Sequence, residues 1–162
     1  MNMIDKLNNI FAGSPPDEDT KKRVTVECLF YLLMTAYEVV HRGDSRFNDD
    51  ARDFDNVIQY RLENDDARGE QSESIGAYVV IKGDRVTAHR GIHSNPTLTL
   101  VFRDIDAAYG LLTMQDTQFD ALVFGRLKYQ GRLPSLFRFG YLSNYLQDEY
   151  LVSLGGVKAR PF

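Results

Sequence analysis

The amino-acid sequence predicts an α+β domain, in which helices cover one face of a five-stranded, mainly antiparallel or mixed sheet. Three observations predict this class. Apolar residues near the start recur every three or four positions, the middle of the chain alternates with a period of two, and helical spacing returns towards the end. A run of strands that is preceded and followed by helices in the sequence is typical of α+β proteins.

The length and composition fit one independently folding unit. A chain of 162 residues buries about 70% of the surface that it exposes when unfolded. Its hydrophobic content of 43% and charged content of 26% are ordinary for a globular protein. We expect a single domain over 1–162, with an extra N-terminal helix at 1–13, a core at 14–146 and a C-terminal tail at 147–162.

Two helices are predicted in the first quarter of the chain. A short amphipathic helix over 3–11 is ended by Gly13 and carries its apolar residues at helical spacing, namely Ile4, Leu7 and Phe11. A long helix should begin at the capping segment 14–17, with proline in its first turn, and reach His41. Apolar residues surround it so widely that we expect it to be covered on several sides.

Four strands should follow a polar loop at 44–55, in which Phe47 and Phe54 are the large apolar anchors. Alternation and β-branched residues place the strands at 57–62, 75–82, 85–90 and 97–103. Gly83 and Asp84 separate the second strand from the third, which indicates a hairpin. The fourth strand alternates, so one of its faces should be buried.

Helical spacing then returns. Asp104 can cap a helix that reaches Leu112, and either Asp116 or Thr117 can cap a second short helix that Gly125 closes. A short fifth strand is expected at 126–129, before Gly131. The last amphipathic helix should begin near Pro134.

Charge and cysteine content restrict the partners and the compartment. The formal charge of −4 argues against nucleic acid and anionic membranes as unassisted partners. The lone Cys28 excludes an internal disulfide, and with no secretory pattern we expect a cytoplasmic protein. The apolar segment 24–40 contains Glu27 and Glu38 and is too short for stable membrane insertion, so we interpret it as a buried helix.

The stretch from Asn95 to Leu146 resembles the second half of a sterol-carrier-protein type 2 domain. It consists of the alternating strand, the acid-capped helix, the short helix ending at Gly125, a basic strand with Gly131 and an apolar helix. A looser match reaches back to about residue 20. The resemblance implies a five-stranded sheet with an apolar tunnel for fatty acyl chains, acyl-CoA or sterols.

A lipid tunnel needs a concave apolar wall, to which aromatic side chains contribute large rigid surfaces. The expected wall combines residues of the long helix, three strands and the last helix: Leu33, Tyr37, Tyr60, Tyr78, Leu100, Phe102, Phe137, Tyr141 and Tyr145. The alternative is that these side chains fill an ordinary core. The protein would then be an interaction module with a filled tunnel, serving a lipid-pathway enzyme.

Signals for catalysis are weak in this sequence. His89 and His93 have a spacing that suits a metal only on a helix, whereas a strand end is expected here. Cys28 lies in an apolar helix and is expected to be buried. We therefore predict no enzyme, no catalytic or metal-binding residue and no cofactor, and leave a protein partner or a homodimer open. An enzyme built around His89 is the third interpretation.

Overall fold

The structure is a computed structural model that describes residues 17–63, 75–113 and 115–151. The predicted helix at 3–11 and most of the predicted tail lie outside the described residues. The helices are α2 (Glu18–Gly43), α3 (Ser45–Ala51), α4 (Ile105–Leu112), α5 (Gln118–Val123), α6 (Leu133–Leu146) and the π-helix η2 (Gln147–Leu151). The strands are β1 (Asn56–Leu62), β2 (Gly76–Lys82), β3 (Arg85–Arg90), β4 (Leu98–Phe102) and β5 (Leu127–Gly131).

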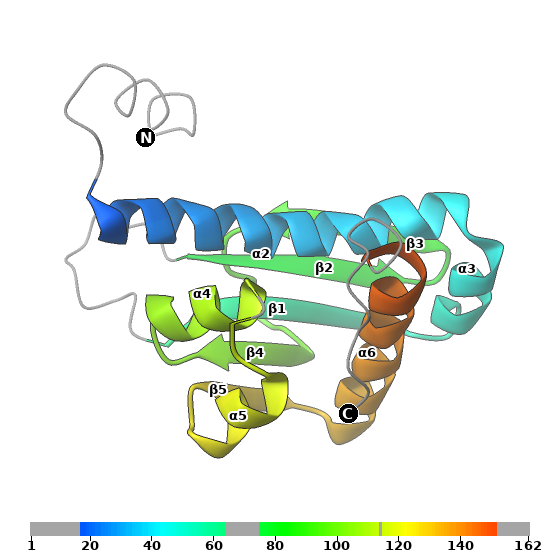
Figure 1. Cartoon of the computed structure of the whole chain (residues 1–162). Coiled ribbons are helices and arrows are strands. Elements are labelled where there is room, and N and C mark those ends of the chain that lie inside the picture. The colour runs from blue at the N-terminus through cyan, green and yellow to red at the C-terminus, as the bar shows by residue number, and fades with distance from the viewer. Residues whose placement is uncertain (1–16, 64–74, 114, 152–162) are drawn as a thin grey trace.

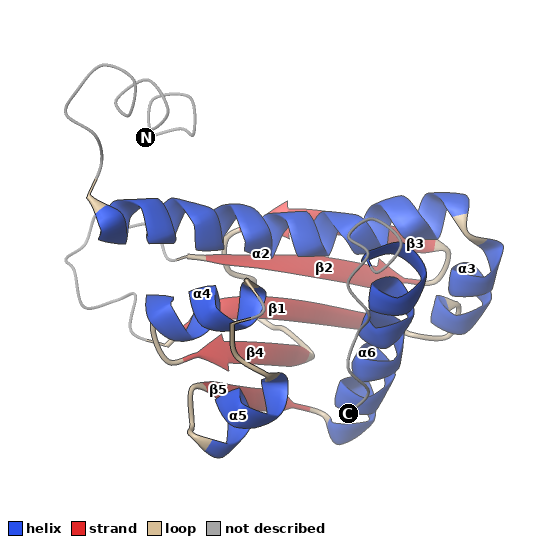
Figure 2. Ribbon diagram, in the orientation of Figure 1, coloured by secondary structure: helices blue, strands red, loops and turns tan. Residues whose placement is uncertain are grey.

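The five strands form one mixed sheet in the order β3-β2-β1-β4-β5. Strands β1 and β4 are parallel, and the other neighbours are antiparallel. Helices α2, α4, α5 and α6 lie on the same side of the sheet (Figures 1 and 2). This arrangement confirms the predicted α+β class and the predicted hairpin.

The register decides which side chains face the helices. Tyr60 of β1 lies between Ala77 of β2 and Leu100 of β4, so these three residues share a face. Gln59 and Tyr78 are also paired, and they share the opposite face. All five residues of β4 are buried, including those that alternation assigned to an exposed face. On the side of β4 away from the helices, Val101 is paired with Arg61 of β1 and Lys128 of β5, two residues with long side chains.

Helix α2 begins one residue after the predicted capping segment ends. The carboxylate of Asp17 accepts a hydrogen bond of 2.6 Å from the backbone nitrogen of Thr20. This places the N-cap at Asp17 and the first helical residue at Glu18, so the prolines are not in the first turn. The prediction of proline in the first turn was therefore wrong. At the other end, the helix extends to Gly43.

Only one stripe of α2 is buried, which corrects the expectation of cover on several sides. The stripe consists of Val26, Phe30, Met34, Tyr37 and Val40. Leu32 and Val39 point away from the sheet and are 62% and 60% exposed, and Cys28 is exposed as well. By length and composition alone α2 could cross a membrane. In this fold its inner stripe packs on the sheet.

The predicted polar loop at 44–55 contains the helix α3. Asp44 caps this helix, because its Oδ1 accepts hydrogen bonds from the backbone nitrogens of Arg46 and Phe47 at 2.9 and 3.1 Å. Phe47 and Ala51, four residues apart, are fully buried. Two apolar positions among many polar ones were too weak a periodic signal to predict a helix.

The C-terminal half follows the prediction closely. Asp104 caps α4, because its Oδ1 accepts a hydrogen bond of 2.8 Å from the backbone nitrogen of Ala107. Of the two residues predicted as caps of α5, the structure uses Thr117 and not Asp116. Gly131 has a φ of +136°, and a Cβ there would lie 2.3 Å from the carbonyl oxygen of Thr97. The close approach of β4 and β5 therefore requires glycine at this position.

Candidate functional site

An aromatic cluster fills the space between the sheet and the helices α2, α3 and α6. We define it by seven residues: Phe30, Tyr37, Phe47, Tyr60, Phe102, Phe139 and Tyr145. The rings of Phe30 and Tyr60 meet edge to face, with centroids 5.5 Å apart. Phe139 brings α6 into the cluster, with its centroid 5.8 Å from that of Tyr37 and 6.2 Å from that of Tyr60. The cluster thus joins the last helix to the central strand.

Six of the nine residues predicted to line a tunnel belong to this interior. They are Leu33, Tyr37, Tyr60, Leu100, Phe102 and Tyr145. Four of the six are buried, whereas Leu33 and Tyr145 are partly buried and pack against the core. Residues from the long helix, the parallel pair of strands and the last helix therefore meet in the core.

Tyr78 does not share a wall with Tyr60, because it faces the other side of the sheet. Its ring stacks on the ring of His89, with centroids 4.9 Å apart. It also meets the ring of His93 edge to face, with centroids 5.0 Å apart. The backbone nitrogen of His93 donates to Oε1 of the buried Gln59 at 2.6 Å. Assigning both tyrosines to one wall was an error of register. Tyr60 is paired with Ala77, and Tyr78, the next residue along β2, points to the opposite face of the sheet.

Phe137 and Tyr141 lie on the outer face of α6 and are 71% and 51% exposed. This helix instead buries Ser135, Phe139, Leu142 and Leu146. The phenol of Tyr141 donates to Oδ2 of Asp50 at 3.1 Å, on the surface. Apolar residues occupy more than one side of α6, so spacing alone could not identify its buried side.

Three members of the aromatic cluster were missed as site residues. Phe30 and Phe139 have the helical spacing of core positions, and that spacing was the available signal. Phe47 lies in the segment that was predicted to be a loop, and no periodic pattern revealed it.

Burial raises the pKa of both buried tyrosines of the cluster, Tyr37 and Tyr60. The Tyr37 hydroxyl forms a hydrogen bond of 2.5 Å with Oγ of Ser143, and burial raises the pKa of the phenol. Tyr60 is 9% exposed, and its hydroxyl is not one of the two buried polar atoms without a partner in the described ranges, which are Oδ1 of Asn48 and Nε of Arg126. Burial, followed by the nearby Tyr37 and Tyr129, raises the Tyr60 pKa well above its usual value.

Helix α6 is held over the cluster by hydrogen bonds at several levels. Ser135, near its start, donates from Oγ to Oδ1 of Asn56 at 2.6 Å. The Arg138 guanidinium donates to the backbone carbonyl of Asp50 at 2.9 Å. Near its end, the Tyr145 hydroxyl donates to Oδ2 of Asp44 at 2.7 Å. Most of these bonds are partly accessible to water.

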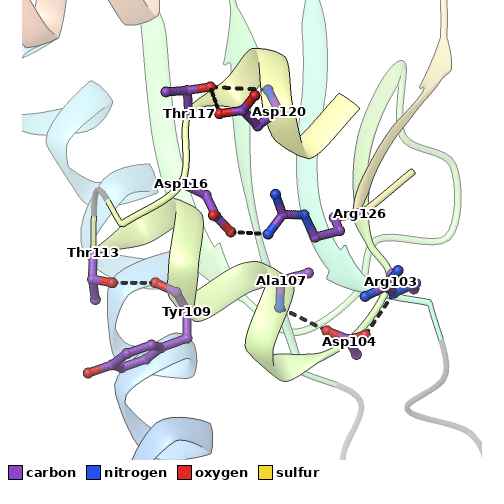
Figure 3. A network of polar contacts seen from close by, with 9 residues as sticks. All are labelled: Arg103, Asp104, Ala107, Tyr109, Thr113, Asp116, Thr117, Asp120 and Arg126. Carbon is purple, nitrogen blue, oxygen red and sulfur yellow. Dashed lines mark hydrogen bonds and ion pairs between the residues drawn. The ribbon is translucent and has the colours of Figure 1, made fainter. Parts of the chain in front are cut away.

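A separate polar groove of about 550 Å³ lies between the start of α2 and the segment that contains α4. Its lining includes Lys22, Asp106 and Asp116. Lys22 pairs with Asp106 at 2.9 Å, and Asp116 pairs with Arg126 at 2.5 Å, near the centre of the network in Figure 3. Lys22, Asp106 and Asp116 are therefore engaged in ion pairs within the protein.

The described residues around His89 do not form a metal site. Oγ of Thr87 contacts Nε2 of His89 at 3.1 Å, and Nδ1 of His93 accepts from the backbone nitrogen of Asn95. Over the ranges that the structure describes, no three His, Cys, Asp or Glu side chains are placed to hold one metal ion.

Comparisons with known proteins connect this architecture to solved folds. No family model and no curated protein matches the sequence. The chain is similar to the sterol carrier protein domain 2 of Helicoverpa armigera, with 13% identity, a TM-score of 0.50 and coverage of 82% of this chain and 94% of that one. It is also similar to the apo form of Sterol Carrier Protein 2 from Yarrowia lipolytica, with 13% identity, a TM-score of 0.49 and coverage of 72% and 91%. The likeness to the Helicoverpa domain shows that the chain has the sterol-carrier-protein fold.

Proposed function

We propose that this protein is a non-catalytic lipid-binding domain that carries or presents a long apolar molecule between α6 and the sheet. The observation that carries this proposal is the aromatic cluster, which lies beneath a C-terminal helix in a sterol-carrier-protein fold. The proposed lining is the interior part of the predicted wall, together with Phe30 and Phe139. Fatty acyl chains, acyl-CoA and sterols are the ligand classes that the resemblance suggests.

The energetics suit a carrier. Burying a chain of about sixteen carbons is favourable by about 10 kcal/mol relative to water, at ~0.8 kcal/mol per methylene. A bilayer offers the same chain nearly as much. A carrier therefore needs a binding site only about as apolar as a membrane, and apolar and aromatic side chains that face each other across an interior meet this requirement.

Release of the ligand requires an element that moves, and α6 is the candidate. Its buried apolar anchors are Phe139, Leu142 and Leu146, of which Phe139 contacts two rings of the cluster. Its polar ties to the rest of the domain are single hydrogen bonds. Such bonds exchange readily with water at modest net cost, about 1 kcal/mol each. We propose that α6 lifts away from Tyr37 and Tyr60 to admit a hydrocarbon chain.

The close contacts between rings of the aromatic cluster favour one alternative to the lipid carrier. The ring centroids of Phe30 and Phe102 lie 5.2 Å apart, and both side chains are almost fully buried, as in an ordinary core. A filled interior would make the domain an interaction module, an accessory subunit for a lipid-pathway enzyme or a homodimer. Both functions fit a cytoplasmic location, which the single cysteine motivates.

Two matched variants of α6 test lipid binding. Delipidated protein is titrated with a fluorescent fatty acid of sixteen to eighteen carbons, and binding should be saturable with one site per chain. Phe139→Leu changes a residue that is 4% exposed and should weaken binding severalfold, whereas Phe137→Leu changes an exposed ring and should leave binding unchanged. Circular dichroism checks that both variants fold.

The same titration separates the two functions. Absence of saturable binding by the folded wild-type protein would exclude the carrier and leave the interaction module. Equal weakening by both variants would place the ligand elsewhere on the protein.

A further inference from the structure

Exposed apolar side chains gather at one edge of the sheet. Strand β5 forms this edge, and both α5 and α6 contact it (Figure 1). Half of the ten large apolar side chains that are exposed among the described residues lie just before or just after β5 in the chain. Soluble domains rarely expose apolar groups together in this way unless the surface docks on a protein or a membrane. We call these five residues the apolar edge: Leu122, Val123, Phe124, Leu133 and Phe137.

The same stretch of chain carries positive charge only. Residues 121–146 contain three arginines and one lysine and no aspartate or glutamate, whereas the whole chain has a formal net charge of −4. Two of these cations pair with carboxylates of other segments, but Arg132 and Arg138 have no carboxylate partner among the described residues. Arg132 is exposed and directly precedes Leu133. The negative net charge, which argued against anionic membranes, therefore does not describe the apolar edge.

We propose that the apolar edge docks on the surface of a lipid bilayer that contains anionic headgroups. Phe124 and Leu133 enter the interface between the headgroups and the acyl chains, and Arg132 lies beside the phosphates. Aromatic and aliphatic side chains with neighbouring arginine or lysine are favoured at this depth of a bilayer. Only side chains enter the membrane, so docking needs no membrane-spanning helix.

Two features favour a bilayer over a protein partner. The apolar edge has two parts, one at each end of β5, and a strand of five residues separates them by about 16 Å. A fluid lipid surface accepts both parts wherever they lie, whereas a protein partner would need two matched pockets. The edge also includes the start of α6, so docking places the helix that is proposed to lift next to the membrane that supplies its ligand. The inference rests on the proposed function to this extent, because a carrier must visit a bilayer to load.

Co-sedimentation with sucrose-loaded vesicles tests the docking surface. Wild-type protein should bind vesicles of equal parts phosphatidylcholine and phosphatidylserine, and should bind vesicles of phosphatidylcholine alone more weakly. Phe124→Ser combined with Leu133→Ser should lower the partition coefficient about tenfold for both vesicles, because two apolar side chains no longer leave water. The matched control combines Leu32→Ser with Val39→Ser. These two residues are as exposed, at 62% and 60% against 66% and 61%, but they lie on α2, so vesicle binding should be unchanged.

The contribution of charge is tested by a separate variant. Arg132→Gln should weaken binding to the mixed vesicles about fivefold, as expected for one cation near an anionic surface, and leave binding to phosphatidylcholine vesicles unchanged. Circular dichroism checks that every variant folds.

Titration with the fluorescent fatty acid separates docking from ligand binding. The wild type and the Phe124→Ser, Leu133→Ser protein should bind the fatty acid equally, because neither residue belongs to the proposed lining. Fatty-acid binding without vesicle association, or equal weakening of vesicle association by the two double variants, would overturn the docking surface while the carrier function stands. Vesicle association that only the edge variant weakens, in a protein that binds no fatty acid, would support the docking surface and overturn the carrier. Self-association of the wild type without vesicles, abolished by the edge variant, would show instead that the apolar edge joins two copies of the chain.

Discussion

The hydroxyl of Tyr145 donates a hydrogen bond of 2.7 Å to Oδ2 of Asp44, although the two residues are 101 positions apart. Tyr150 donates to the same oxygen at 2.5 Å. The other oxygen of Asp44 caps α3 through the backbone nitrogens of Arg46 and Phe47. One carboxylate therefore holds together the end of α2, the start of α3 and the C-terminal end of α6.

This arrangement predicts a stability loss in acid that depends on Asp44. Hydrogen bonds from Tyr150 and Tyr145, followed by those from the backbone, lower the Asp44 pKa from 3.8 to about 2. A lowered folded-state pKa stabilises the protein above pH 3.8, and this contribution is lost as the pH falls from about 4 towards 2. Urea unfolding at a series of pH values should show this loss in the wild type.

Asp44→Asn provides the comparison, because asparagine also caps helices but carries no charge. Its free energy of unfolding should fall less steeply than that of the wild type between pH 4 and pH 2. Parallel pH profiles for the two proteins would mean that the carboxylate contributes nothing in the folded state beyond what it contributes in the unfolded chain.

The two faces of α2 should respond very differently to truncation. Met34 is fully buried, and Met34→Ala should cost about 2–5 kcal/mol of unfolding free energy. Leu32 is 62% exposed on the same helix, and Leu32→Ala should change that free energy by less than about 0.5 kcal/mol. Equal losses in chemical denaturation would indicate that the outer face of α2 is also covered in solution.

Two glycines should give opposite results when replaced by alanine. Gly140 lies inside α6 with open space where a Cβ would stand, so Gly140→Ala should stabilise the protein by about 0.5–1 kcal/mol. Gly131→Ala should destabilise it by at least about 2 kcal/mol, because the new Cβ would meet Thr97 and the φ of +136° is strained for alanine. Thermal unfolding measures both, and a tolerated Gly131→Ala would contradict the close contact of β4 and β5.

Sequence periodicity predicted the helices and strands better than it predicted which of their faces are buried. The strands, the hairpin and the caps at Asp104 and Thr117 depend on local chemistry, and the structure confirms them. The faces of α2 and α6 depend on which side meets the sheet, and this is decided by tertiary packing. Tyr78 illustrates the same point, since its side of the sheet follows from pairing with Gln59 and not from its own strand.

The candidate site was predictable to the extent that it coincides with the core. Tyr60 and Phe102 were identified because buried aromatic residues of strands line interiors, whether or not these bind ligands. Phe47 was predicted as an apolar anchor of a loop but not as a site residue, since its helix is short and mostly polar.

Motion of α6 should accompany lipid binding, and the single cysteine makes this measurable. Cys28 is exposed on α2, so it accepts a spin label in the wild-type chain. Phe137→Cys adds a second label at an exposed position on α6. If α6 lifts to admit a hydrocarbon chain, the distance distribution between the two labels should shift or broaden when a long-chain lipid is added.

The control pairs Cys28 with Arg85→Cys on β3, which is exposed and belongs to the sheet that α2 covers. Its distance distribution should stay the same with and without lipid, because the packing of α2 on the sheet does not need to open. A shift in both pairs would indicate general loosening of the domain. If lipid binds and neither pair responds, the ligand enters without displacing α6, and the ring contacts of Phe139 with Tyr37 and Tyr60 persist in the complex.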